Sequence, residues 1–402
     1  MTFAIDRRAV LAGGAILFVG AAAEPDAMAR TALNEAVPLA PKDRLKQVRA
    51  ISLRGLSPRA RIDVTAALRG AELDLAIAGA ADPARRYALQ LRLQSGTDAT
   101  PAETYALALD RARLLTARVD ALLRAEGLAE GSVAARLRRF ARDPRYLYSD
   151  DAAGRDRAVA DMNRWLVAAR GRLPAQFGMI PAAVDHIAVR RMSPAEEAAG
   201  KAGYRVVPSF DGSVPGAYFV DLQDIAHRPS WSLPSVVHHE TLPGHLIQLP
   251  LQARADPHPL RLRAAAGFVE GWAVYAEQLA AEAGAFAQDR PAEIGYLQWL
   301  LFRLGRAIID VGVNAMDWSD AAALAFVREL QGDPVAFAPF AKDIARVRAE
   351  PGGFAGPMLN WLGFEQIREA AVRHSGDARR LHDRLLANGA FPLALFGDGS
   401  AR

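Results

Sequence analysis

Apolar residues recur with helical spacing over most of this chain. They fall at positions i, i+3, i+4 and i+7 before residue 173 and again after residue 233, which is the pattern of amphipathic helices. Thr100 and Glu103 form a capping-box pattern before one such segment, because each side chain can bond the other's backbone N–H. The helices predicted in this way span residues 59–81, 101–125, 133–142, 154–172, 233–253, 261–282, 292–314, 319–329, 334–348, 357–373 and 377–387.

One stretch, residues 184–222, has the period of β-strands instead. Its segments DHIAVRRM and GYRVVPSF alternate apolar and polar residues, and FDGSVPGAYFVDL adds a Gly/Pro turn between extended segments. Downstream of the N-terminal segment, residues 31–41 are expected to form an irregular leader. We find no repeat of solenoid length and no low-complexity linker. The sequence therefore predicts a single, mainly α domain over residues 30–402, with a small β-sheet beside the helix that starts at 233.

Residues 1–29 have the three parts of an export signal. Arg7 and Arg8 precede an apolar run rich in Ala and Gly, and the tripeptide Ala-Met-Ala at 27–29 matches the small-x-small cleavage pattern. Adjacent arginines before a mildly apolar run are typical of twin-arginine signals. The run over residues 9–23 is short for a helix that spans a bilayer. We therefore expect a periplasmic protein with no stable membrane insertion after the signal is removed.

Composition narrows the chemistry that the chain can perform. The 402 residues carry a formal charge of +4, and the basic residues are scattered among acidic ones. No basic patch with interleaved aromatic residues is present, so we expect no nucleic-acid partner. The chain has no cysteine, which excludes thiol nucleophiles and thiolate metal sites. Any metal must be held by His, Asp or Glu.

The stretch VHHETLPGHLIQ at residues 237–248 contains two histidines with an unusual spacing. The common zinc signature H-E-x-x-H places its histidines four apart on one helix face, whereas His239 and His245 are six apart. On a straight helix they would point about 240° apart. Pro243 removes a helical hydrogen bond and Gly244 tolerates unusual dihedrals. We therefore expect this pair to kink the helix and to turn the second histidine back toward the first.

A catalytic zinc also needs a third ligand and a nearby base. The segment GFVEGWAVYAEQL offers Glu270 and Glu277, which are seven apart and lie on one helix face. Either of them could be the third ligand, and the sequence leaves this choice open. Glu240 directly follows the first histidine and could act as general base on a zinc-bound water. His238 is a substitute ligand only with the same kink, because it lies about 10 Å from His245 along a straight helix.

HETLPGHLIQ also resembles the HE-x-x-PGHH-x-Q core of the bacterial domain-of-unknown-function 885 family. Three further motifs resemble the family in the same order: PSFDGSVPGAYFVDL, GFVEGWAVYAEQL and RAIIDVGVNAMDWS. The resemblance covers roughly residues 87–371. Members are zinc-metallopeptidase-like and similar in architecture to thimet oligopeptidase and the helical zinc carboxypeptidases. The resemblance therefore implies a helical zinc-peptidase-like bundle.

By this resemblance, one zinc per chain would be held by His239, His245 and Glu270, with Glu240 as the general base. The other residues that we expect near the site are Glu277 as a supporting or substitute ligand, Asp310 as a partner of a ligand histidine, and Arg306 and Tyr218 as substrate contacts. A guanidinium such as that of Arg306 can bind a substrate carboxylate through its fork of donors. For Asp310 and Arg306 the alternative is an ordinary place on a helix surface.

The chain departs from the family pattern at positions that matter for catalysis. The second histidine of the family's PGHH is Leu246 here, and a downstream family histidine is Asn314. The segment EPGGFAGPMLNWLG lacks the tyrosine of the family's PGQA-x-x-Y pattern. Loss of such donors to the oxyanion can cost orders of magnitude in rate, although the Asn314 amide could replace one of them.

Three hypotheses follow for the function. The first is an exported zinc-dependent peptidase that cleaves peptide or peptide-like amide bonds. The second is a catalytically weakened relative that binds zinc and peptides without significant hydrolysis, which the missing donors favour. The third is a helical scaffold without a metal. Metal content separates the third hypothesis from the others, and turnover that depends on Glu240 separates the first from the second.

Overall fold

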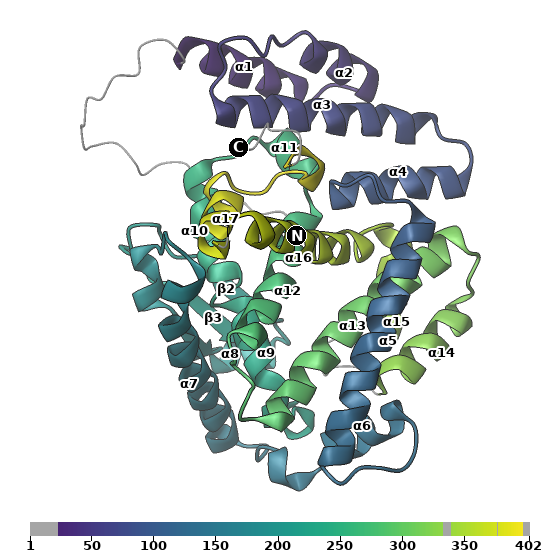
Figure 1. The fold of residues 1–402 in the computed structure, drawn as a ribbon, viewed down its shortest axis with the longest axis vertical. Coiled ribbons are helices and arrows are strands. Elements are labelled where there is room, and N and C mark those ends of the chain that lie inside the picture. Colours follow the sequence, from purple (N-terminus) through teal and green to yellow (C-terminus); the bar gives the residue numbers. More distant parts are fainter. Residues whose placement is uncertain (1–22, 333–338, 376, 397–402) are drawn as a thin grey trace.

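The computed structural model describes residues 23–332, 339–375 and 377–396, and the fold is mainly α with a small three-stranded sheet (Figure 1). The helices of the N-terminal half are α1 (Ala23–Ala36), α2 (Pro41–Arg49), α3 (Pro58–Gly79), α4 (Pro83–Ser95), α5 (Pro101–Ala125), α6 (Val133–Ala141), α7 (Ala152–Gln176) and α8 (Pro194–Ala198). Those that follow are α9 (Leu233–Glu240), α10 (His245–Ala255), α11 (Pro259–Arg263), α12 (Gly267–Glu282), α13 (Arg290–Ala315), α14 (Asp320–Gln331), α15 (Phe340–Ala349), α16 (Ala355–Ser375) and α17 (Ala378–Ala387).

The strands all lie inside the predicted β region. They are β1 (Ala188–Arg191), β2 (Tyr204–Val206) and β3 (Ala217–Val220), in the spatial order β1-β3-β2. β1 runs parallel to β3, whereas β2 runs antiparallel to it, with Arg205 opposite Tyr218. The sheet lies beside α9, because the Arg205 side chain on β2 forms an ion pair with Glu240 at the end of that helix. The predicted sheet and its neighbour are therefore confirmed.

The helical core is built around α12 and α13. α12 packs against α16, and α13 packs along α5, so that segments far apart in the sequence lie side by side (Figure 1). Both central helices are apolar on nearly all faces, which is the pattern of helices buried on every side. The predicted capping box at the start of α5 is also present, with both reciprocal hydrogen bonds between Thr100 and Glu103. α1–α3 form a layer at one end of the molecule (Figure 1).

Several predicted boundaries were wrong. The expected irregular leader is instead the end of α1 and the short link to α2. Leu33 of α1 is buried in a cluster with apolar residues of α2 and α3. The helix expected over residues 233–253 is interrupted rather than kinked, since α9 ends at Glu240 and α10 begins at His245. The helix expected over residues 261–282 is divided into α11 and α12. Helices α2 and α4 lie outside the predicted ranges.

Two of the predicted segments fall partly outside the described residues. Arg7, Arg8 and all but the last residue of the apolar run of the expected signal lie before residue 23, and the start of the helix expected over 334–348 lies in 333–338. Within the described ranges, no helix combines the length and the apolarity needed to cross a membrane.

Candidate metal centre

The site begins at the break between α9 and α10. The chain turns back through residues 241–244, and the Leu246 N–H donates to the Thr241 carbonyl oxygen at 3.1 Å across this turn. A Cβ atom added at Gly244 would lie 2.0 Å from the carbonyl oxygen of His239 and 2.5 Å from that of His238, so only glycine fits here. This close approach brings His245 back to His239, with ring centroids 4.9 Å apart and planes at 88°.

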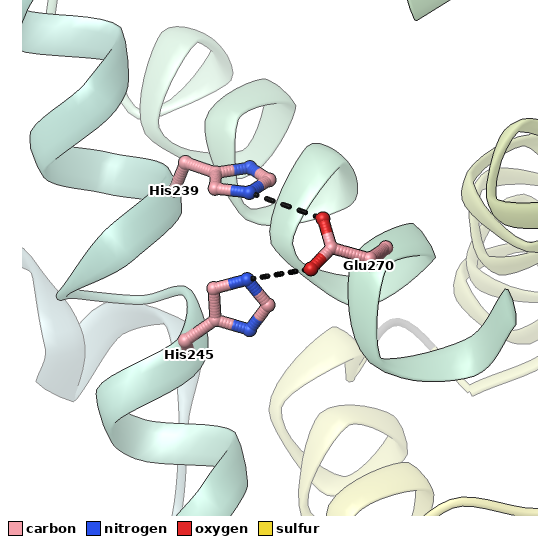
Figure 2. A group of neighbouring side chains, drawn as sticks. All are labelled: His239, His245 and Glu270. Carbon is pink, nitrogen blue, oxygen red and sulfur yellow. Dashed lines mark ion pairs between the residues drawn. The ribbon is translucent and has the colours of Figure 1, made fainter. Parts of the chain in front are cut away.

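Glu270, in the first turn of α12, completes a group of three (Figure 2). Its two carboxylate oxygens lie 3.5 Å from Nε2 of His239 and 3.4 Å from Nε2 of His245. Each of the three residues offers a ligand atom, and these atoms all lie within 4.8 Å of one another. Ligands bound to zinc at about 2.0–2.2 Å in a tetrahedral arrangement lie about 3.4 Å apart. The two carboxylate-to-imidazole distances, one for each oxygen of Glu270, are close to this spacing.

Glu277, two turns further along α12, lies on the other side of the His239 ring. The Nδ1–H of His239 donates to Oε1 of Glu277 at 2.9 Å, which leaves the Nε2 lone pair free on the side of Glu270. Arg303 of α13 donates to the same oxygen at 2.9 Å, and the Ser235 hydroxyl donates to the other oxygen. A carboxylate behind a ligand histidine fixes its tautomer and its orientation. The two glutamates that the sequence left open thus occupy different places in the structure.

The environment of His245 suits a metal ligand better than a solitary histidine. The ring is fully buried, and neither of its nitrogens has a hydrogen-bond partner among the described residues. Burial lowers the pKa of His245 although Glu270 raises it. A neutral imidazole keeps a lone pair, and a buried lone pair without a partner is costly. A bound cation would remove this cost, so the residues present fit a metal ion.

The imidazoles of His239 and His245 favour the charged form of the Glu270 carboxylate. Enclosure by protein atoms disfavours the charged form of its carboxylate, but the two imidazoles outweigh this effect and hold its pKa well below the usual range. For His239, burial and the guanidinium of Arg303 lower the pKa, while the carboxylates of Glu270 and Glu277 raise it above its ordinary value overall. The group thus offers a cation one nitrogen from each imidazole and one oxygen from an anionic carboxylate.

Glu240 is held by an ion pair that the sequence did not predict. Its carboxylate accepts a hydrogen bond from Arg205 on β2, and both side chains are largely buried. Tyr218 on β3 lies opposite Arg205 on β2. Burial and the negative charge of Glu240 raise the pKa of Tyr218. One signal for Arg205 was available, because it is the charged residue of an otherwise apolar strand, but its partner lies 35 positions away.

Other candidate residues lie among different partners. The Nδ1–H of His238 donates to the Leu242 carbonyl oxygen at 3.0 Å, and burial lowers the pKa of His238 to about 4. Asp310 accepts hydrogen bonds from the backbone N–H groups of residues 352, 354 and 355, each at 3.0 Å, and so anchors the start of α16. Asn314 donates to the Asp310 side chain at 3.1 Å and to the Val347 carbonyl oxygen at 3.2 Å. These hydrogen bonds hold the fold rather than the group of three.

A small pocket opens from the candidate centre. Its volume is about 200 Å³, and Glu270 lines it together with Arg303 and Arg306 of α13. The remaining wall is largely apolar and includes Phe354 and Trp361 from the region of α16. Arg306 donates to Asp343 of α15, so the predicted substrate contact is a paired arginine that nevertheless faces a cavity.

The chain is similar to known proteins in sequence and in structure. The family model described as "Bacterial protein of unknown function (DUF885)" matches residues 7–398. A "putative lipoprotein" from Colwellia psychrerythraea has a similar structure, with a TM-score of 0.72, 24% identity, and coverage of 92% of this chain and 68% of its own. A second one, from Shewanella oneidensis and of unknown function, has a TM-score of 0.61, 16% identity, and coverage of 92% and 71%. Both likenesses show the fold. None of the curated proteins matches the chain.

Proposed function

The chain belongs to the DUF885 family of bacterial proteins, and we propose that it is an exported, zinc-dependent peptidase. The observation that carries this proposal is the convergence of His239, His245 and Glu270 from three helices, with carboxylate-to-imidazole distances of 3.4 and 3.5 Å. Two histidines and one glutamate are a ligand set of catalytic zinc sites, which keep one position open for water or substrate. Imidazole and carboxylate together favour zinc over the harder cations.

A zinc ion held here would act as a Lewis acid and lower the pKa of a coordinated water. The protein's own residues supply the remaining functions. Glu240 would accept the proton of the attacking water as general base, and its ion pair with Arg205 holds this carboxylate in place. Glu277 orients His239 so that Nε2 faces Glu270. Water adds to the scissile carbonyl carbon, the C–N bond breaks, and the proton held by Glu240 passes to the leaving amine.

A second function is favoured by one observation at Asn314. Its amide already donates to Asp310 and to the Val347 carbonyl oxygen, so it does not replace a donor to the oxyanion in this arrangement. Together with the missing tyrosine in residues 350–363, this favours a relative that binds zinc and peptides without significant hydrolysis. The two functions share the metal centre and differ only in turnover.

Export is part of the same proposal. The pattern of residues 1–29 is that of a signal with adjacent arginines, and the two structural relatives are described as "putative lipoprotein". These two observations support a periplasmic address. It can be tested by fractionation of cells that express the full chain, beside a variant in which Arg7 and Arg8 are both lysine. Retention of the variant in the cytoplasm would support the twin-arginine route, and equal export of both proteins would contradict it.

The central test joins metal content with turnover. Purified wild-type protein should contain about one zinc per chain, and the His239→Ala/His245→Ala double variant should contain none. A mixture of short peptides should be hydrolysed by the zinc-loaded wild type and not by Glu240→Gln. Glu72→Gln, at a half-exposed carboxylate paired with Arg49 on the surface, is the matched control and should behave as wild type. Bound zinc without hydrolysis would support the binding relative and contradict the peptidase. Absence of zinc after zinc is offered would contradict both functions.

A further inference from the structure

The pocket beside Glu270 points to the part of a peptide that this centre would cleave. We infer that Arg303 and Arg306 receive the C-terminal carboxylate of a peptide in this pocket, so that the bond cleaved is the last one in the chain. The inference rests on the proposed peptidase function for the cleavage. The binding of a carboxylate in the pocket can be tested separately from it.

The two arginines line the pocket and keep donors that no other described residue uses. They are three positions apart on α13 and therefore lie on one face of the helix. Each uses one part of its guanidinium in an ion pair, Arg303 with Glu277 and Arg306 with Asp343. The Nε atoms of both are buried and have no hydrogen-bond partner within the described part of the chain. A buried donor without a partner is costly, and a carboxylate is the group that an arginine fork binds best.

Aromatic rings hold Arg306 in position. Its guanidinium carbon lies 3.9 Å from the ring centroid of Phe302 and 4.6 Å from that of Phe354. A guanidinium packed between rings has little rotamer freedom left to lose when an anion binds. Arg346 adds positive charge at the same pocket, with its guanidinium 4.9 Å from Phe354 and an ion pair to Glu350. Arg303 and Arg306 are thus built into the wall, whereas Arg346 is exposed at its rim.

The size and lining of the pocket decide what else enters with the carboxylate. At about 200 Å³ it is smaller than the roughly 300–1,000 Å³ of pockets for drug-sized ligands, so it has room for about one amino-acid residue. The side chains of Val274, Met358 and Trp361 make the rest of the wall apolar. We therefore expect a preference for an apolar or aromatic last residue.

The position of Glu270 connects the pocket with the candidate metal centre. The same side chain lines the pocket and lies 3.4 Å from Nε2 of His245. A residue that fills the pocket with its carboxylate on the arginines therefore has its own amide nitrogen, and the carbonyl before it, directed toward the centre. Addition of water to that carbonyl and rupture of its C–N bond give a shortened peptide with a new carboxylate and one free amino acid. This is a carboxypeptidase reaction, whereas an endopeptidase would need an open channel on this side.

Binding can be tested without turnover. The probes are N-acetyl-phenylalanine and N-acetyl-phenylalaninamide, which differ only in the terminal carboxylate. Their affinities are measured by calorimetry on metal-free protein, so that no carboxylate can bind to zinc. We expect the acid to bind at least about tenfold more tightly than the amide, which corresponds to a charge-assisted hydrogen bond. Arg306→Gln/Asp343→Asn replaces the buried pair by two amides and should weaken binding of the acid by at least about tenfold. Arg348→Gln, at an exposed arginine of α15 paired with Asp320, should bind as wild type.

The outcomes separate this inference from the proposed function. Equal affinity for acid and amide, no binding of the acid, or unchanged binding in the double variant would overturn the carboxylate pocket. Zinc-loaded protein should then be given a peptide ending in phenylalanine, with a free or an amidated C-terminus, and the products identified by mass. Release of phenylalanine from the free peptide alone supports the inference. Cleavage of both peptides at internal bonds would support the proposed peptidase and contradict the role of the pocket in substrate binding. Binding of the acid without any cleavage would support the carboxylate pocket and contradict the proposed peptidase.

Discussion

Gly244 is the residue whose replacement tests the geometry of the candidate centre most directly. In Gly244→Ala, the added Cβ would lie 2.0 Å from the carbonyl oxygen of His239 and 2.6 Å from its carbonyl carbon. Both neighbours are backbone atoms of a candidate ligand, so a side-chain rotation cannot relieve the contact. The turn that joins α9 to α10 must therefore open, and His245 must move relative to His239.

The size of this movement follows from the same distances. Cβ atoms are essentially never found within 3.0 Å of such atoms, so the contact must lengthen by at least the difference from 2.0 Å, which is 1.0 Å. Metal sites tolerate departures of only about 0.2 Å from their ligand distances. A shift several times larger should cost at least one ligand. We therefore expect zinc affinity to fall by at least about 100-fold, which is about 2.7 kcal/mol.

The assay is competition for zinc against a chelator of known affinity, with the free energy of unfolding measured by urea on the same samples. Gly171→Ala is the control, because a Cβ at Gly171 in α7 meets no atom within 4 Å. It should leave zinc affinity unchanged and stabilise the fold by about 0.5–1 kcal/mol, as Ala replaces Gly inside a helix. If Gly244→Ala bound zinc as tightly as wild type, the close approach of this turn would not set the ligand geometry.

Three further predictions address the surroundings of the site. Glu277→Gln removes the charge behind His239, and we expect zinc affinity to fall about 10- to 100-fold in the chelator assay, with unchanged affinity arguing against an orienting role. Asp310→Ala leaves three backbone N–H groups without their acceptor, so the free energy of unfolding should fall by about 3–5 kcal/mol while zinc content persists. Loss of zinc in that variant would instead place Asp310 in the metal centre. Burial lowers the pKa of His382, so the unfolded chain binds more protons and stability should fall as the pH drops through the ordinary value of 6.5. His382→Gln should reduce that slope by up to about 1.4 kcal/mol per pH unit, and an identical slope would refute the assignment.

The sequence predicts those helices whose pattern of apolar residues is visible in their own segment, without knowledge of their neighbours. The long helix α5 buries one stripe at helical spacing, α13 is apolar along most of its length, and the Thr100 cap of α5 is a local interaction between residues three apart. α1 has no such signal, because its buried face consists of alanines and Leu33 and is defined by contact with α2 and α3. Its existence depends on tertiary packing that the local pattern does not contain.

The site could be predicted as a set of residues but not as an arrangement. The histidines and glutamates stand out by type and spacing, yet Glu270 and Glu277 share one face of α12 and are equivalent in the sequence. The structure distinguishes them because the His239 ring lies between them, with Nε2 toward Glu270 and Nδ1 toward Glu277. The pairing of Arg205 with Glu240 also joins a strand to a helix across 35 positions, and no local pattern encodes it.

The charges around the centre give a reason for this arrangement. Three carboxylates belong to the candidate site, those of Glu240, Glu270 and Glu277, and two of them are paired with arginines, Arg205 and Arg303. The carboxylate without an arginine is the candidate ligand, so the group carries one net negative charge when the imidazoles are neutral. A divalent cation would reverse this to one net positive charge. Such a site attracts the charge that develops on a carbonyl oxygen under attack. Had either arginine been paired with Glu270, the cation would have had to displace an ion pair before it could bind.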